Sequence, residues 1–211
     1  MSNAVSIVDY GVGNINSVAN MLKRAGAEVT LVRSPVEVLA ARRLVLPGVG
    51  AFDSCRTGLD SIAGLEDAIR TFIGMGRPML GICVGMQLLA TESEEGVLPG
   101  LNIIPGKVKR FVFDNSASKL HLKVPHMGWS SVTPAALSPL FGGGLSELNR
   151  FYFVHSYYFS AADETDVAAW CDYGGPFAAS VRKGNVYGAQ FHPEKSHRFG
   201  LQMFRNFIHI T

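Results

Sequence analysis

A strand that runs directly into a cysteine and then into a helix is the feature that most limits how this chain folds. The buried-looking run Pro78–Ile82 leads into Cys83, and a helical pattern begins at Val84. Gly81 and Gly85 flank the cysteine, because a side chain at either place would clash where the strand turns abruptly into the helix. The pattern predicts a nucleophile elbow that holds the cysteine in a strained, exposed conformation. Peptide N–H groups and the helix dipole favour an anion there, so we expect a reactive thiolate.

A second pattern, near the end of the chain, supplies the partners that such a thiol needs. The strand-like run Val186–Phe191 leads into His192, Pro193 and Glu194. A cysteine nucleophile requires an imidazole to take and return its proton, and the imidazole requires an acceptor that fixes its tautomer. Residues two apart on an extended segment project to the same side, so Glu194 can reach His192. Taken alone, Cys83 could be a packing residue of the core, and His192 with Glu194 could be a surface ion pair. The two patterns together predict a catalytic triad of Cys83, His192 and Glu194.

Two glycine-containing turns in the first half also follow strands. Asp9–Asn14 resembles a dinucleotide-binding turn, but Asn16 stands where the third glycine of G-x-G-x-x-G belongs, so we predict no dinucleotide site. Pro47–Gly50 lies at the carboxyl edge of the expected sheet, where open α/β folds bind ligands, and an ordinary strand-ending turn is the equally supported alternative. The candidate donors of an oxyanion hole are the peptide N–H groups of Val49, Gly50 and Val84.

The order of apolar and helical segments predicts an α/β fold. In the first half, apolar runs bounded by glycine and proline alternate with helical patterns, which is typical of a parallel, doubly wound sheet. The expected strands there are Ala4–Asp9, Glu28–Val32, Arg43–Leu46 and Pro78–Ile82, and the expected helices are Asn14–Ala25 and Ser61–Met75. The second half suggests antiparallel strands at Lys107–Phe113, Arg150–His155, Val167–Asp172, Phe177–Val181 and Asn185–Phe191, then a helix at Phe199–Ile208. We therefore predict one domain, residues 1–211, with an open, mostly parallel, doubly wound sheet, a nucleophile elbow and an added antiparallel β portion in the C-terminal half.

Composition narrows the possible partners and the compartment. The chain has 211 residues, of which 47% are hydrophobic, enough to bury a sizeable core. Its 19 Lys and Arg residues against 17 Asp and Glu residues form no dense basic cluster, so we expect no nucleic acid partner. Without a signal-like start or a long apolar run, we expect a cytoplasmic protein that contacts no membrane. Cys55, Cys83 and Cys171 lack CxxC spacing, so we expect no metal and no disulfide, passive packing for Cys55 and Cys171, and no cofactor.

Several motifs together resemble a known family. The chain resembles the class I, triad-type glutamine amidotransferases in the segments Gly81–Gln87, Phe191–Ser196 and Pro47–Gly50. Within that family, the chain is similar to the glutaminase subunits of imidazole glycerol phosphate synthase in the segments Asp9–Asn14, Pro125–Trp129 and Phe153–Tyr158. The motifs occur in the family's order and cover nearly the whole chain. The resemblance therefore implies the class I glutamine amidotransferase fold.

The resemblance also implies a reaction. Cys83 would attack the side-chain amide of glutamine to form a glutamyl thioester, His192 would protonate the departing ammonia, and Glu194 would orient His192. The residues implied in holding glutamine are Gln87, Glu95, His155, Ser156 and Tyr157. A carboxylate at position 95 suits an ammonium group, although the acidic stretch Glu92–Glu95 has simple solvation as its alternative.

A partner follows from the same resemblance. The family's glutaminase subunit forms a heterodimer with a (β/α)8-barrel cyclase subunit, which receives ammonia through an internal channel and makes imidazole glycerol phosphate and an aminoimidazole carboxamide ribotide in histidine biosynthesis. Asn14, Trp129 and Lys195 resemble residues that face this partner. We expect the isolated subunit to be nearly idle, because the strand around Val49 would present its oxyanion donor only when the partner docks.

Three alternatives stay open at the level of sequence. Ser130–Ser131 stands where the family often has asparagine, and Ser196–Gly200 and Glu94–Gly100 resemble a sister group that supplies ammonia to a nucleotide-sugar amidating synthetase in surface polysaccharide biosynthesis. The triad is common to both groups and does not discriminate. A cysteine peptidase on the same scaffold is the second alternative and predicts peptide cleavage. A non-enzymatic subunit is the third, and it predicts that cellular function survives the loss of Cys83.

Overall fold

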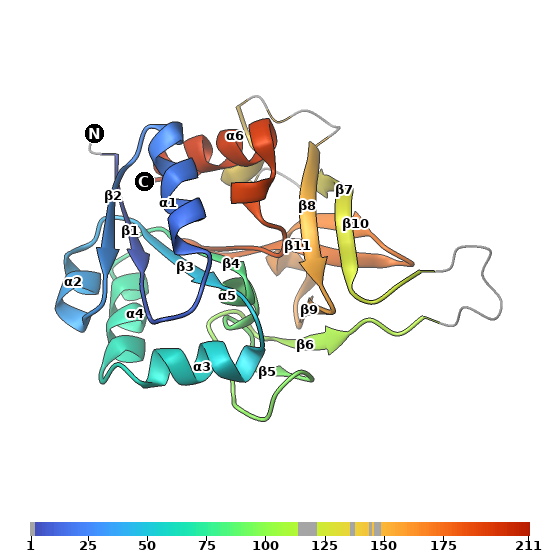
Figure 1. The fold of residues 1–211 in the computed structure, drawn as a ribbon, viewed down its shortest axis with the longest axis horizontal. Coiled ribbons are helices and arrows are strands. Elements are labelled where there is room, and N and C mark those ends of the chain that lie inside the picture. Colours follow the sequence, from blue (N-terminus) through green and yellow to red (C-terminus); the bar gives the residue numbers. More distant parts are fainter. Residues whose placement is uncertain (1–2, 114–121, 136–137, 144, 146–148) are drawn as a thin grey trace.

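A 12-stranded mixed sheet forms the centre of the molecule in the computed structural model, which describes residues 3–113, 122–135, 138–143, 145 and 149–211. Five strands form its parallel half, in the order β2-β1-β3-β4-β12 (Figure 1). Their bounds are Ala4–Val8 for β1, Glu28–Val32 for β2, Leu44–Gly48 for β3, Met79–Cys83 for β4 and Val186–Ala189 for β12. Strands β3, β4 and β12 are buried throughout. Parallel strands covered on both faces read as continuous apolar runs, which is why the sequence reveals them.

Helices cover both faces of the parallel half. On one face, α1 (Ile15–Ala25) packs beside α6 (His197–Ile208), and on the other α4 (Leu65–Gly74) contacts both α2 (Pro35–Ala40) and α3 (Phe52–Asp60) (Figure 1). The apolar residues of these helices recur at helical spacing, so each helix buries one stripe against the sheet. Among the described residues, no helix combines the length and the apolar character needed to cross a membrane.

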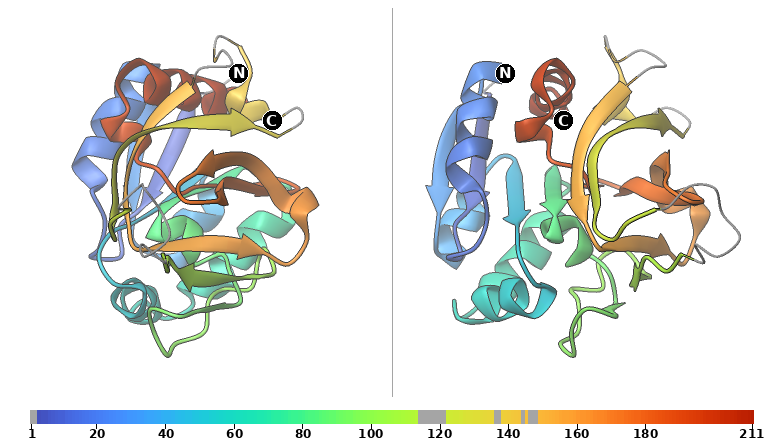
Figure 2. Two further views of the ribbon diagram at one scale, coloured as in Figure 1. Left: turned by 90° about the vertical axis from the view of Figure 1, so that its right-hand side faces the viewer. Right: turned by 45° about the vertical axis from the view of Figure 1, so that its right-hand side comes forward.

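The second half of the chain adds antiparallel strands beyond β12. The sheet continues through β11 (Pro176–Lys183), β10 (Val167–Asp172), β7 (His126–Pro134) and β8 (Asn149–His155). A side branch contains β9 (Tyr157–Ala161), β6 (Gly106–Arg110) and β5 (Glu92–Ser93). Short 3-10 turns lie at Pro139–Phe141, Glu164–Asp166 and Pro193–Lys195. In Figure 2 the antiparallel strands curve away from the plane of the parallel ones. They therefore form a second wall beside the parallel half.

This architecture confirms the predicted fold class, although several elements differ from the expectation. Helices α2 and α3 and strands β7 and β9 were not predicted, and the expected helix over 61–75 begins only at Leu65. Gly64, at φ 76, precedes that helix in a left-handed conformation that ends the turn before it. Strand β7 alternates in exposure, but it was missed because only Val132 is aliphatic among its less exposed positions, which also include His126, Gly128 and Ser130.

Close backbone packing at the predicted elbow depends on three glycines. A Cβ on Gly81 would lie 2.5 Å from the carbonyl oxygen of Gly85, and a Cβ on Gly48 would lie 2.5 Å from the nitrogen of Gly85. A Cβ on Gly85 itself would overlap the carbonyl oxygen of Leu46. The requirement for glycine at these positions is a requirement for space, as the sequence reasoning supposed for residues 81 and 85.

Candidate active site

Cys83 lies where β4 ends and α5 (Val84–Gln87) begins, with φ 55 and ψ −112. A positive φ costs a residue with a side chain about 1–3 kcal/mol, so the surrounding packing must enforce it. The predicted strain is therefore present, but the predicted exposure is not, because Cys83 is only 5% exposed. Helix α5 has four residues, so the expected contribution of the helix dipole to a thiolate is small. A thiolate here depends on donors from neighbouring side chains.

A pocket of about 360 Å³ opens above the sulfur. Its walls come from the turn after β3, from α5, from the loop after β5, from the junction of β8 and β9, and from the segment after β12. The lining residues are Val49, Gly50, Cys83, Val84, Gln87, Glu95, Pro125, Val154, His155, Ser156, Tyr157, His192 and Lys195. All the predicted catalytic, oxyanion and glutamine-binding residues except Glu194 are thus brought to one cavity.

A second cavity, of about 480 Å³, lies at the opposite, amino-terminal end of the parallel strands. It is lined in part by Arg42, Arg43 and Arg77. The guanidinium groups of Arg43 and Arg77 are bonded to backbone carbonyls, including that of Ile210. Among the described residues that line this larger cavity, none is a cysteine, a histidine or a residue with a carboxylate side chain. We therefore place the candidate active site in the smaller cavity, which Cys83, His192 and Glu95 line.

The imidazole of His192 lies between the sulfur and a carboxylate. Its Nδ1 donates to Oε1 of Glu194 at 2.8 Å, which leaves Nε2 for Cys83. Burial alone would lower the pKa of His192, but hydrogen bonds to Cys83 and Glu194, together with their charges, outweigh it and raise that pKa to about 10. The ring is therefore protonated at neutral pH beside the sulfur. Asn14, expected to face a partner, donates to the same Glu194 oxygen at 3.3 Å and so helps to hold the carboxylate in place.

Two side chains hold the turn after β3, where the oxyanion donors were predicted. The Tyr10 hydroxyl donates to the carbonyl of Pro47 at 2.5 Å, and the Cys55 thiol donates to the carbonyl of Val49 at 3.4 Å. Burial raises the pKa of Cys55 to about 11 and that of Tyr10 well above its ordinary value, so both stay neutral donors. Cys55 was expected only to pack, whereas its thiol also fixes a carbonyl beside Gly50, which has φ 89.

Gln87 and Glu95, two of the residues predicted to hold glutamine, keep acceptor oxygens beside the pocket that they line. Gln87 donates both N–H groups of its amide, at 3.0 Å each, to the carbonyl of Tyr157 and to Oε1 of Gln190, so only its own oxygen is left. Glu95 accepts from the Phe52 N–H at 2.9 Å through one oxygen, and burial raises its pKa.

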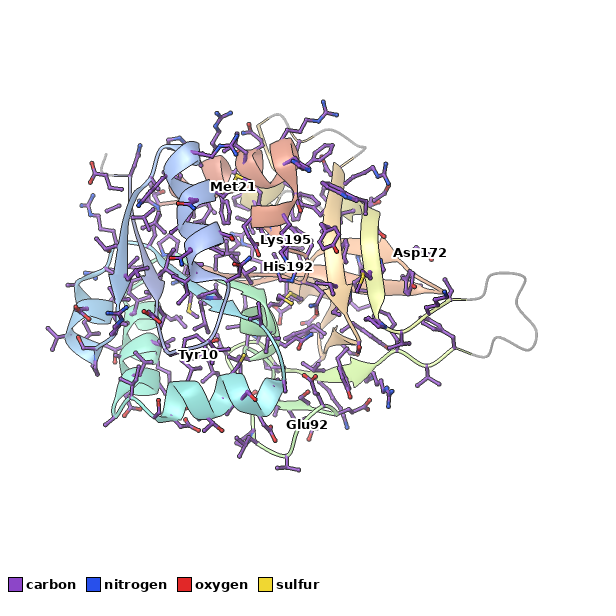
Figure 3. The ribbon with its side chains drawn as sticks, in the orientation of Figure 1. Tyr10, Met21, Glu92, Asp172, His192 and Lys195 are labelled. Atoms are coloured by element: carbon purple, nitrogen blue, oxygen red, sulfur yellow. The ribbon has the colours of Figure 1, made fainter. Side chains whose placement is uncertain are left out.

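The other acidic residues of the stretch Glu92–Glu95 are solvated, as the alternative interpretation of this stretch predicted. Glu92 and Glu94 lie 3.4 and 3.8 Å from Lys107 on the outer surface. Figure 3 shows Glu92 at the edge of the molecule, whereas His192 and Lys195 lie near its centre. Only Glu95, of the three glutamates, lines the pocket.

His155 lines the pocket, but both of its ring nitrogens are engaged within the protein. Its Nδ1 donates to the carbonyl of Tyr157 at 2.8 Å, and its Nε2 accepts from Nδ1 of His126 at 3.0 Å. Nε2 of His126 in turn accepts from the Ser130 hydroxyl at 2.8 Å. Burial lowers the pKa of His126 to about 4 and that of His155 to about 3, so both rings are neutral. His155 therefore shapes the wall and holds a carbonyl, and it has no nitrogen left for a ligand.

An exposed aromatic surface lies beside the pocket mouth. Trp129, 37% exposed, stacks on His197 with ring centres 5.4 Å apart and contacts the edge of Tyr152. The Lys195 ammonium lies 5.9 Å from the ring centre of Tyr152, and Met127 is 61% exposed. We call Met127, Trp129, Tyr152, Lys195 and His197 the aromatic rim. Lys195 belongs both to this rim and to the pocket, so two of the three predicted partner-facing residues lie together at the mouth.

Sequence reasoning missed three residues that build the site. Gln190 is buried next to Cys83 and precedes His192 by two positions. The rule that residues two apart on a strand project to the same side, which placed Glu194 beside His192, would also have placed Gln190 there. Tyr10 and His126 act through contacts that span 37 and 29 residues, and nothing local in the sequence indicates such contacts. Within the described part of the chain, no three His, Cys, Asp or Glu side chains gather as a metal site would require.

Comparison with known proteins agrees with this geometry. The family described as class-I glutamine amidotransferase matches residues 6–210, and the chain belongs to that family. Its fold is similar to that of PurLQS from Thermotoga maritima, with a TM-score of 0.71 and 18% identity over 98% of both chains. More specifically, it is similar to proteins named imidazole glycerol phosphate synthase subunit HisH. The relative from Chromobacterium violaceum is 46% identical over 97% of this chain and 96% of that one, and HisH 2 from Pseudomonas aeruginosa is 45% identical over 98% and 100%.

The buried neutral histidines predict that acid destabilises the fold. An unfolded histidine titrates near pH 6.5, whereas His126 in the fold titrates at about 4, so between these values the unfolded state binds more protons and stability falls as the pH is lowered. We expect His126 to account for about 2 kcal/mol of the loss in unfolding free energy between about pH 7 and pH 5. His126→Asn keeps a donor for His155 and does not titrate, so urea unfolding of this variant should show a smaller pH difference. An unchanged difference would mean that His126 has the same pKa in the folded and unfolded states and is not the group responsible.

Proposed function

We propose that this protein is the glutaminase subunit of an imidazole glycerol phosphate synthase, which hydrolyses glutamine to glutamate and ammonia for histidine biosynthesis. The observation that carries the proposal is the hydrogen-bonded series from Cys83 through His192 to Glu194 at the base of a pocket. Identity of about 45% over the full length to proteins named HisH supports this pathway over the nucleotide-sugar alternative.

The geometry suits a two-step reaction. The thiolate of Cys83 adds to the side-chain amide carbon of glutamine, and the C–N bond breaks as His192 gives its proton to the nitrogen, so that ammonia leaves and a glutamyl thioester remains. Water then loses a proton to His192 and adds to the thioester, and the C–S bond breaks to release glutamate. In both steps the peptide N–H groups of Val49, Gly50 and Val84 are the candidate donors to the developing oxyanion. The imidazolium and thiolate are restored at the end of the cycle.

The acceptors in the pocket suit the α-ammonium group of the substrate. Gln87 has only its amide oxygen left, and Glu95 offers a carboxylate in the same pocket. An ammonium can donate to both and its charge is matched by the carboxylate, whereas a peptide N–H has a single hydrogen and no charge, and an anionic group would be repelled. Ser156 and Tyr157 line the same pocket. We infer that free glutamine, with its amino group charged, is selected over a glutamine residue inside a peptide.

Glutamate release from free glutamine tests the proposed reaction. Wild-type protein, mixed with its partner, should release glutamate, and Cys83→Ala should lose at least about a thousandfold in rate because the covalent step needs the sulfur. An electrophilic glutamine analogue should label Cys83, and glutamine-containing peptides should stay intact. Peptide cleavage, or glutamate release that persists in Cys83→Ala, would contradict the proposal.

Glu95 and Glu94 form a matched pair for testing substrate recognition. Glu95→Gln removes the charge that faces the α-ammonium, so we expect KM for glutamine to rise about tenfold with a smaller change in kcat. Glu94→Gln alters a neighbouring carboxylate that lies outside the pocket and accepts from the Arg110 N–H, so its kinetics should match the wild type. Steady-state glutaminase assays measure both variants. Equal KM values for the two would remove Glu95 from substrate binding.

We further propose that a (β/α)8-barrel cyclase subunit docks on the aromatic rim and receives ammonia from the pocket. The rim supports this because it exposes aromatic rings and Met127 directly beside the mouth, and aromatic side chains are enriched where proteins bind one another. Lys195, on both the rim and the pocket, would bring the partner to the site of ammonia release. Partner docking would then raise the low glutaminase turnover that we expect of the isolated chain.

Substitution of the central rim residue tests the docking surface. Trp129→Ala should weaken binding of the barrel subunit by about tenfold, because a stacked, half-exposed indole is a common binding hot spot. Val36→Ala is the control, since Val36 is 76% exposed on α2, away from the rim. Calorimetric titration with the purified partner measures both. Isolation of the native complex identifies the partner itself, and a nucleotide-sugar synthetase in place of the barrel would overturn the pathway assignment.

A further inference from the structure

We propose that Gln190 is a further catalytic residue, which donates a side-chain N–H to the sulfur of Cys83 and stabilises its thiolate. Gln190 follows β12 directly and is fully buried, and its Nε2 lies 3.9 Å from Sγ. This inference deepens the glutaminase function proposed above and rests on it.

The orientation of the Gln190 amide is determined by its neighbours. The carbonyl oxygen of Tyr157 can only accept, so the amide of Gln87 must turn its NH₂ group toward it. The second N–H of Gln87 then points at Gln190, which must present its oxygen, at 3.0 Å. The NH₂ group of Gln190 is therefore the end that faces Cys83. One backbone carbonyl thus fixes which atom of Gln190 contacts the sulfur.

That carbonyl is itself held in place. Tyr157 opens β9, and its oxygen also accepts from Nδ1 of His155 at 2.8 Å. His155 is in turn held by His126, and His126 by Ser130. Each member of this series has its donor and acceptor roles assigned without conflict. The contact at Cys83 is therefore the end of a rigid network that begins on β7.

The sulfur needs such a donor because little else can stabilise its charge. Cys83 is 5% exposed, so water reaches the atom poorly, and α5 is a single short turn. A buried anion without donors is strongly disfavoured, and a hydrogen bond to a charged acceptor is stronger than one between neutral groups. His192 supplies one such donor, and Gln190 supplies another without carrying a proton that the reaction could remove.

Other titratable groups near the sulfur leave a clear range of pH for a test. Besides His192, the groups that interact with Cys83 are Tyr10, from the loop after β1, and Cys55, from α3. Both have pKa values raised by burial and stay neutral below pH 10 or so. Glu194 acts through His192, His155 is neutral, and Glu95 lines the pocket with its carboxylate bonded to the Phe52 N–H. Thiol reactivity between about pH 5 and pH 9 therefore reports on Cys83 with His192 and Gln190.

The test measures alkylation of Cys83 by iodoacetamide in the intact chain, followed by mass spectrometry of the peptide that contains it. Gln190→Met and Gln190→Leu keep the buried volume and remove the N–H. We expect alkylation to slow by about tenfold near neutral pH in both, with the midpoint of the pH profile moved to higher pH. Ser180→Ala is the control, because Ser180 is equally buried in the adjoining strand and its hydroxyl donates to Gly188 without touching the sulfur. Its profile should match the wild type.

The outcomes separate this inference from the proposed function. Alkylation within about twofold of wild type in folded Gln190→Met or Gln190→Leu, with an unmoved profile, would overturn the role of Gln190. Loss of glutaminase turnover without a change in alkylation would overturn it as well, because the residue would then act on the substrate. If instead wild-type Cys83 alkylates readily, slows in both variants, and yet releases no glutamate, the inference stands and the proposed function fails.

Discussion

The site depends on how closely the backbone of α5 approaches the ends of β3 and β4. Gly48, Gly81 and Gly85 leave no room for a Cβ at this contact. The chain can turn so sharply only with Cys83 at a positive φ, and that turn directs the sulfur away from the core of the sheet and toward the pocket. The tight packing also supplies the rigidity that a strained residue requires, because a looser contact would let Cys83 relax to an ordinary conformation.

Because the reactive groups are buried, their hydrogen-bond partners determine which of them can carry a charge. Cys83, His192 and Glu194 are all nearly inaccessible to solvent, so any charge on them must be satisfied by one another and by the neutral amides of Asn14 and Gln190. The rise in the pKa of His192 shows that attraction from the sulfur and the carboxylate exceeds the cost of burial. Asn14 and Gln190 extend this arrangement at its two ends. The protein thus stabilises an ion pair in a setting that would otherwise favour neutral groups.

The sequence allowed prediction of features that follow local rules. Buried parallel strands appear as apolar runs, glycines mark the elbow around Cys83, and alternation along a strand places Glu194 beside His192. The sequence did not indicate that Cys83 would be buried, because the wall above it comes from β8 and β9, which are far away in the chain. Nor did it indicate that α5 would end after four residues. The contacts of Tyr10 and His126 join distant segments, and their chemistry depends on a tertiary arrangement that no short motif encodes.

The hydrogen-bonded histidines have a consequence for proton movement. The series Ser130, His126, His155 ends on the carbonyl of Tyr157, and a peptide oxygen has no hydrogen to hand onward. The series is therefore a dead end for conduction, even though two imidazoles in sequence resemble a proton wire. His192 is insulated from β7 on that side, so each proton that it gives up or regains is exchanged with whatever occupies the cavity.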